Sequence, residues 1–172
     1  CAALEAALGT EVQIANDTNL MARILVQRNG ARDGTTLVVF IGYGVGMGII
    51  IDGKVYAGPT GAAAEFGHMN HEPEGPLCRC GRRGCLEAYV ADYAILRNYR
   101  GSDPAAEPAH HAVDPLEMNA IQDRAASGDP RAAAAYATAG LALGYGIARA
   151  IALLNAGRVV IAGPGAHAYD LL

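Results

Sequence analysis

Three cysteines are the residues of this sequence whose types and spacing most clearly could do chemistry. Cys78, Cys80 and Cys85 fall within eight positions, beside Gly81 and Gly84. A disulfide between Cys78 and Cys80 would be strained, because so short a loop does not allow disulfide geometry. Thiolate sulfur and imidazole nitrogen are instead ligands that zinc accepts in a tetrahedron. The glycines let the backbone curl so that the sulfurs converge, and the spacing predicts a structural zinc site.

A histidine must complete a site with three sulfurs, and the sequence offers two. His68 and His71 both lie upstream of the cysteines, and spacing alone does not choose between them. With four protein ligands no position is open to a substrate, so the metal would fold the loop rather than react. The other interpretation is three surface thiols in a reducing cytoplasm. Cys1 is far in the sequence from the other three cysteines, and we expect it to be an ordinary helix residue.

Polar residues also stand where a strand pattern meets a helix pattern. Residues 11–15 alternate and predict a short strand. Asn16 and Asp17 follow as helix N-cap formers, and apolar residues then recur at helical spacing. Open α/β sheets bind ligands at the carboxyl ends of their strands. Asn16 and Asp17 are therefore candidate ligand-binding residues.

A glycine-rich hairpin follows. Residues 37–41 predict a buried strand and residues 49–57 a hairpin arm, with Gly42, Gly44 and Gly46 at every second position near the bend. Glycines spaced by two remove the side chains from one face, so a phosphate could approach the backbone closely. A bulged hairpin without a ligand gives the same pattern.

Helices and one more strand account for most of the remaining chain. We expect helices over residues 1–8, 86–99, 118–127 and 130–155, and a buried strand over 158–162. The long helix contains Gly140, Gly144 and Gly146, which imply close packing because each costs up to about 1 kcal/mol relative to Ala. His110 and His111 lie in a polar insert that we expect to be an exposed loop.

Composition excludes some classes of protein. The 172 residues are 52% hydrophobic, enough for a core, which excludes global disorder. A net charge of −4 argues against nucleic-acid binding by this segment itself. No signal segment precedes the body, so we expect a cytoplasmic protein that does not contact a membrane. The chain starts at Cys1 and stops where another helix should begin, so we expect a piece of a longer protein.

Four segments, in order, resemble the motifs of the ROK family, which comprises bacterial sugar kinases and sugar-responsive repressors. Residues 64–87 resemble its metal signature and residues 15–19 its Asn-Asp-Ala-Asn motif. Residues 42–48 resemble its glycine phosphate motif, and residues 159–165 its adenosine-side motif. The resemblance implies an α/β protein with the actin-like, RNase H-like sugar-kinase fold.

The resemblance also implies how the chain is organised. It would be the C-terminal lobe of a ROK domain, residues 1–172, incomplete at both ends, with a zinc-binding loop insertion within 65–87. A homodimer is expected on the same grounds.

Individual roles also follow from the resemblance. It assigns zinc to four residues: His68, Cys78, Cys80 and Cys85. It assigns sugar hydroxyls to five: Asn16, Asp17, Glu65, His68 and Glu87. Asp17 matches the general base of the kinase members, and a carboxylate beside a hydroxyl can accept its proton as the phosphoryl group arrives. The phosphate and nucleotide side would comprise four glycines: Gly42, Gly44, Gly46 and Gly163.

Two positions depart from the kinase pattern. Tyr43 replaces a small Thr, and Pro164 replaces a Gly and lacks an N–H group. The sequence therefore predicts the sugar-sensing domain of a transcriptional regulator that binds a hexose or derivative, with DNA bound only through a segment absent from this chain. The alternative is an ATP-dependent hexose kinase with Asp17 as base, which alone would need ATP and magnesium. A third interpretation is a zinc-stabilised interaction module.

Overall fold

A mixed sheet with helices on both faces forms the body of the protein. The computed structural model describes residues 1–30, 32–108 and 113–172. The sheet has four strands in the order β3-β2-β1-β4. β1 (Thr35–Ile41) lies antiparallel to β2 (Val45–Ile51) and parallel to β4 (Arg158–Ala162). The short β3 (Lys54–Tyr56) pairs with β2, so the predicted α/β class is confirmed.

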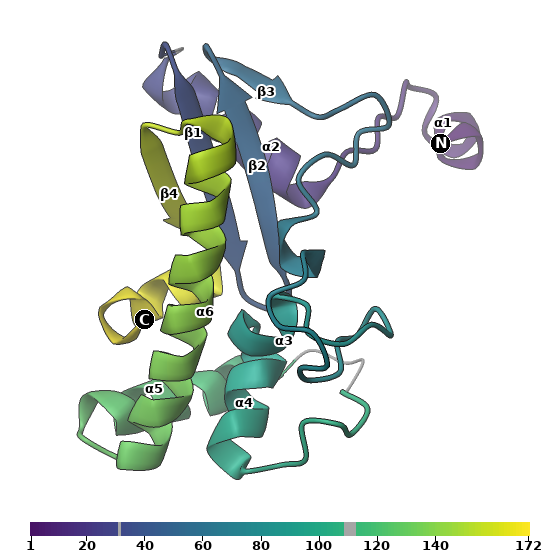
Figure 1. Ribbon diagram of the computed structural model, residues 1–172. Helices are drawn as coiled ribbons and strands as arrows, with labels where there is room; N and C mark the ends of the chain where they lie inside the picture. Colours follow the sequence, from purple (N-terminus) through teal and green to yellow (C-terminus); the bar gives the residue numbers. More distant parts are fainter. Residues whose placement is uncertain (31, 109–112) are drawn as a thin grey trace.

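Alternation along β1 divides the core between two faces. Leu37, Val39 and Ile41 are buried in the larger cluster, toward α6 (Pro130–Leu154). Val38 points the other way and packs with Ala22 of α2 (Asp17–Asn29). In Figure 1, α6 crosses one face of the sheet and α2 lies behind the other. The carboxyl ends of β1 and β4 therefore lie together, between these two layers.

Glycines of β2 allow α2 to pack close to the sheet. A Cβ on Gly46 would lie 2.6 Å from Thr18 Cγ2, and one on Gly48 would lie 2.8 Å from the Thr18 carbonyl oxygen. Helix α2 begins as predicted, because Asn16 caps it by accepting a hydrogen bond from the Asn19 N–H. Helix packing therefore accounts for these two glycines without a ligand.

Two predicted elements differ from the structure. The strand predicted over residues 11–15 is wrong: these residues have no regular structure, and Ile14 is 76% exposed. A strand needs a neighbour for its backbone hydrogen bonds, and no described strand pairs with this segment. The single helix predicted over residues 86–99 is also wrong. The extended backbone of Ala91 separates α3 (Glu87–Val90) from α4 (Asp92–Arg100).

The ends of the chain are less regular than the body. α1 (Ala2–Leu8) buries no residue and stands apart from the sheet (Figure 1). A 3-10 helix, η2 (Pro164–Leu171), follows Gly163. It packs against α5 (Pro115–Ala126) and α6. The predicted exposure of His110 and His111 lies outside the described residues.

The long helix α6 is a core helix on one face. Close packing at its glycines is confirmed for Gly140, which meets the Leu172 carbonyl, and for Gly146, where a Cβ would lie 2.7 Å from Leu86 Cδ2. The prediction of close packing is wrong for Gly144, where a Cβ would meet nothing within 4 Å. By length and composition α6 could also cross a membrane. This is weak evidence, since core helices have the same properties.

Gly48 provides a test of the close contact between α2 and β2. Gly48→Ala should destabilise the protein by about 1–3 kcal/mol, because the added methyl group meets backbone that cannot rotate away. The measurement is urea unfolding. Gly144→Ala is the matched control, and it should be neutral or stabilising by up to about 1 kcal/mol. Equal stability of the two variants would contradict this account of the β2 glycines.

Candidate metal centre and ligand cavity

The predicted metal ligands meet at one point. The donor atoms of His68, Cys78, Cys80 and Cys85 all lie within 4.8 Å of one another. Cys80 Sγ lies 3.6 Å from Cys85 Sγ, and Cys78 Sγ lies 3.9 Å from His68 Nδ1. Sulfurs bound about 2.3 Å from a tetrahedral zinc ion stand roughly 3.8 Å apart. The donor set and its spacing therefore fit a metal ion held by four protein ligands.

Backbone turns bring these side chains together. The Cys78 N–H donates to the Arg82 carbonyl over 2.8 Å, and the Gly81 N–H donates to the Cys78 carbonyl over 2.9 Å. Gly81 and Gly84 have φ values of 85° and 72°, a left-handed conformation that glycine adopts readily. A Cβ on Gly84 would also overlap the Glu72 carbonyl. The curled loop thus requires glycine where the sequence has it.

The three thiols affect one another's protonation. Burial raises the pKa of Cys78 and raises that of Cys85 to about 12. Burial also acts upward on Cys80, but hydrogen bonds from the Arg82 backbone and from neighbouring side chains outweigh it and lower its pKa to about 7. Three thiolates so close together need a compensating charge, which a divalent cation supplies.

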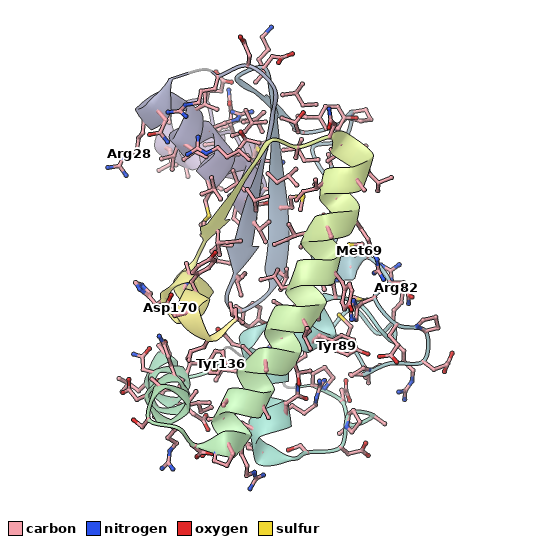
Figure 2. All side chains as sticks on the ribbon, turned by 60° about the vertical axis from the view of Figure 1, so that its left-hand side comes forward. Arg28, Met69, Arg82, Tyr89, Tyr136 and Asp170 are labelled. Atoms are coloured by element: carbon pink, nitrogen blue, oxygen red, sulfur yellow. The ribbon has the colours of Figure 1, made fainter. Side chains whose placement is uncertain are left out.

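His71 lies outside this cluster. Its ring meets the Tyr89 ring edge-on, with centroids 4.8 Å apart. Burial lowers the pKa of His71 and Arg149 adds to this effect, while Glu72 opposes it. Figure 2 shows Met69, Arg82 and Tyr89 on the side of α6 where the metal loop lies. Of the two candidate histidines, the structure brings His68 to the sulfurs.

A separate open cavity of about 320 Å³ brings together four of the five residues expected to bind sugar. The β2 end of the glycine hairpin, the start of α2 and the loop before His68 surround it. Its lining comprises Asn16, Asp17, Thr18, Phe40, Tyr43, Gly44, Val45, Gly46, Ala63, Ala64, Glu65 and Glu87. His68 does not line it. The lining thus combines three carboxylates and one amide with two aromatic rings.

The start of α2 orients the first two polar groups. Asn16 Oδ1 accepts hydrogen bonds from the Asn19 N–H and the Thr18 hydroxyl, so its amide nitrogen is the part left to donate to a ligand. Asp17 Oδ1 accepts from the Thr18 N–H over 2.7 Å. No hydrogen bond from the described residues reaches Asp17 Oδ2, which is therefore an acceptor for a ligand.

Glu87 joins the cavity to the metal cluster. Its side chain is 8% exposed. Oε2 accepts a hydrogen bond from the Val45 N–H over 3.1 Å, and Oε1 lies 3.7 Å from Cys78 Sγ. A Cβ on Gly44 would lie 2.8 Å from Oε2, so glycine is needed there to admit the carboxylate.

The loop before η1 (Phe66–His68) serves both sites. Glu65, its N-cap residue, lines the cavity, while His68 at its end faces the sulfurs. Gly67 between them packs directly on the Val45 carbonyl, where a Cβ would overlap. A short 3-10 turn thus separates a carboxylate that lines the cavity from an imidazole that lies beside the sulfurs.

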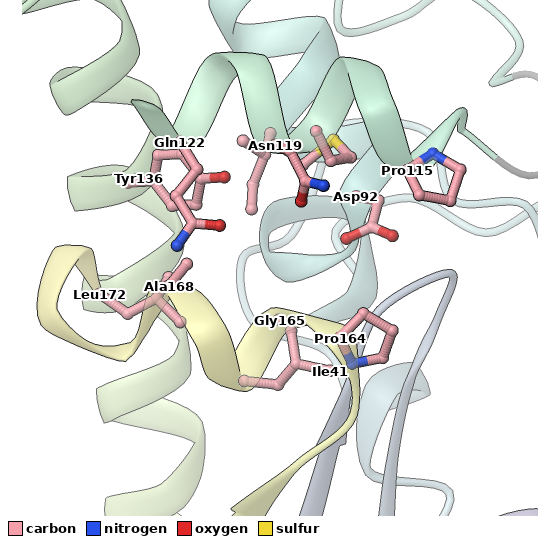
Figure 3. A pocket seen from close by; sticks show the side chains of 12 residues that line it. Ile41, Asp92, Pro115, Asn119, Gln122, Tyr136, Pro164, Gly165, Ala168 and Leu172 are labelled. Carbon is pink, nitrogen blue, oxygen red and sulfur yellow. The ribbon is translucent and has the colours of Figure 1, made fainter. Parts of the chain in front are cut away.

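Gly42 and Gly163 lie apart from this cavity, at the carboxyl ends of β1 and β4. A Cβ on Gly42 would lie 3.0 Å from the Pro164 ring. A smaller cavity of about 100 Å³ opens beside them, between α4, α5 and η2 (Figure 3). Asp92 points into it between Pro115 and Pro164. Burial raises the pKa of Asp92, and the charge of Arg79 opposes this.

Sequence reasoning missed several residues that shape these sites. The pattern over residues 86–99 predicts one unbroken helix and gives no signal for Asp92. The break at Ala91 places Asp92 at the start of α4, where it lines the smaller cavity. Asn19 is buried, and its amide donates to the Gly61 carbonyl over 3.1 Å, which holds the loop leading to Glu65. Its place within the Asn-Asp-Thr-Asn segment was the available signal.

Comparison with known proteins identifies the family. A model of the ROK family matches residues 1–172. The chain belongs to the ROK family. It is 31% identical to a glucokinase of Streptomyces coelicolor over 98% of this chain and 56% of that protein. It is 34% identical to the DNA-binding transcriptional dual regulator NagC of Escherichia coli over 80% of this chain and 34% of NagC.

Solved structures of ROK proteins show the same fold. A ROK glucokinase from Streptomyces griseus, in complex with glucose and AMPPNP, has a TM-score of 0.74 and 30% identity, covering 93% of this chain and 54% of that one. A ROK transcriptional regulator homologous to E. coli MLC has a TM-score of 0.76 and 31% identity, covering 98% and 43%. The predicted actin-like sugar-kinase fold is confirmed. The chain spans about half the length of the glucokinases it matches.

The metal cluster can be tested by removing a ligand. Cys78→Ala should lower the melting temperature by roughly 5–10 °C, because the loop loses its metal. A chelator such as EDTA should lower the melting temperature of the unaltered protein to a similar degree and leave the variant unchanged. Cys1→Ala, which removes an exposed thiol outside the cluster, should melt like the unaltered protein. A chelator without effect would contradict the site.

Proposed function

We propose that this chain is the sugar-sensing domain of a ROK-family transcriptional regulator, binding a hexose or a hexose derivative. The observation that carries the proposal is the cavity in which Asp17, Glu65 and Glu87 converge with the Asn16 amide. Each sugar hydroxyl both donates and accepts, so carboxylates and amides together suit a polyol.

Each polar residue has a distinct part in this proposal. Asp17 Oδ2 and the Glu65 carboxylate accept hydrogen bonds from sugar hydroxyls, and the Asn16 amide donates one. Glu87 is held by Val45 and presents its carboxylate to the same space. His68 does not line the cavity. It binds the metal through Nδ1, which fixes the ring, and its Nε2 donates to the sugar only where a hydroxyl extends beyond this lining toward the metal loop.

The wider organisation is part of the proposal. Residues 1–172 form the C-terminal lobe of a ROK domain, with the metal loop within 65–87 holding a structural zinc ion. The protein acts in the cytoplasm as a homodimer, and DNA is bound by a segment outside this chain. Sugar binding shifts the population of lobe or dimer arrangements and so changes affinity for the operator.

Two residues favour a regulator over a kinase. Tyr43 forms part of the cavity wall, where a kinase has a small Thr, and its ring would obstruct an incoming phosphoryl group. Pro164 offers no N–H group at the end of β4. The similarity to NagC and to the MLC homologue agrees with this choice.

The alternative is an ATP-dependent hexose kinase. The similarity to two Streptomyces glucokinases favours it, as does the position of Asp17 in the cavity. In that case Asp17 would be the general base that deprotonates the accepting hydroxyl. ATP with magnesium would then bind on the side of Gly42, Gly44, Gly46 and Gly163.

Sugar binding is tested by thermal unfolding of the full-length protein with D-glucose and with N-acetyl-D-glucosamine. At about 100 times its dissociation constant, a bound sugar should stabilise the protein by about 2.7 kcal/mol. Asp17→Ala should abolish the shift, because it removes one of the three carboxylates that converge on the cavity and, with it, the acceptor Oδ2. Asp123→Ala, on the exposed face of α5, is the control and should keep it. If a wider hexose panel also gives no shift, the interaction-module interpretation is preferred.

Assays of ADP formation and of operator binding, on the same full-length protein, distinguish a regulator from a kinase. We expect no ADP formation from ATP and hexose, and a change in operator affinity when sugar is added to the full-length protein. Turnover that is lost in Asp17→Asn would overturn the regulator and establish the kinase. The asparagine keeps the shape of Asp17 but cannot accept the proton, so it isolates the chemical step.

A further inference from the structure

Tyr43 contributes an aromatic ring to the ligand cavity. It lies in the turn between β1 and β2 and lines the cavity with Asp17 and Glu87. Its side chain is 47% exposed. In a cavity otherwise lined by carboxylates, an amide and small residues, this ring and that of Phe40 provide the large apolar surfaces.

Arg79 fixes the position of that ring. Its guanidinium lies 4.1 Å from the centroid of the Tyr43 ring and 4.2 Å from that of Tyr93. Nη1 also donates to the Tyr43 carbonyl over 2.7 Å. A planar guanidinium stacks well on aromatic rings, so Arg79 contacts both the side chain and the backbone of Tyr43.

Arg79 is held in place by the metal loop in two ways: through its own backbone, which belongs to the loop, and through Tyr93, which contacts the loop. Arg79 stands between Cys78 and Cys80 in the sequence, so the metal cluster sets the place from which its side chain extends. Tyr93 is 5% exposed, and its hydroxyl donates to Cys78 Sγ over 3.7 Å. The Arg79 side chain thus connects the metal cluster to Tyr43 in the wall of the cavity.

We infer that Tyr43 is a sugar-contacting residue, whose ring packs against the C–H face of a pyranose, and that Arg79 is the residue that positions it. This inference rests on the proposed function of the cavity. The face of an aromatic ring is electron-rich and apolar, which suits the C–H groups of a sugar ring, while the carboxylates bind its hydroxyls. A ring ordered before binding loses less entropy when the ligand arrives.

Calorimetric titration of the zinc-loaded, full-length protein with D-glucose and N-acetyl-D-glucosamine tests the contact. Tyr43→Ala should weaken binding of the sugar that binds by about tenfold, whereas Tyr43→Phe should bind within about twofold of the unaltered protein because the ring remains. Arg79→Met should weaken binding about three- to tenfold. Arg83→Met removes the same charge from the same loop, away from the cavity, and should leave binding unchanged.

A double variant separates positioning from direct contact. If Arg79 acts through Tyr43, then Arg79→Met with Tyr43→Ala should bind no more weakly than Tyr43→Ala alone. Fully additive losses would overturn the positioning role. So would loss of zinc from Arg79→Met, since the effect would then be general to the loop.

The remaining outcomes distinguish this inference from the function on which it rests. Unchanged affinity in Tyr43→Ala, in a protein that binds sugar, would overturn the contact and leave the proposed function standing. If neither these two sugars nor any hexose of the wider panel binds the unaltered protein, both the contact and the proposed function are overturned.

Discussion

The buried carboxylate of Glu87 is the interaction on which both sites depend. A charged group out of water is costly unless it is paired or hydrogen-bonded. Glu87 receives the Val45 N–H on one oxygen and approaches Cys78 with the other. These contacts join the start of β2 to α3 and the metal loop, which follow it by more than 30 residues in the sequence. Glu87 thus contacts both the cavity and the metal cluster through one buried side chain.

Small residues make this frame possible. Gly44 leaves room for the Glu87 carboxylate, and Gly67 allows the 3-10 turn to lie on Val45. Gly46 likewise lets Thr18 of α2 reach the sheet. The same alternation of glycines that suggested a phosphate site is thus required for packing, and the two explanations are not exclusive. Glycine lets neighbouring side chains approach the backbone closely, and for the same reason a ligand can approach it.

What the sequence could predict was set by local rules. The metal cluster follows from cysteine spacing with glycine turns, and the start of α2 follows from Asn16 as a cap. The strand over residues 11–15 failed because its alternation has no partner among the described strands. The break at Ala91 and the stack of Arg79 on Tyr43 depend on tertiary neighbours, and no short sequence window reports those. The roles assigned to Asp17 and Glu65 rest on resemblance, although the cavity brings the two residues together.

The arrangement of the metal loop makes a structural metal relevant to ligand binding. Glu65 and His68 are separated by a single 3-10 turn, so the backbone couples a side chain that lines the cavity to one that lies beside the sulfurs. Glu87 and Arg79 provide two further routes from Cys78 and its neighbours to the cavity wall. A metal ion held by four protein ligands would have no position open to a reactant, yet it would restrict the conformations of three side chains around the cavity. If the cavity holds a sugar as proposed, a metal ion in the cluster would act on its affinity through preorganisation, and this effect would be the same in a regulator and in a kinase.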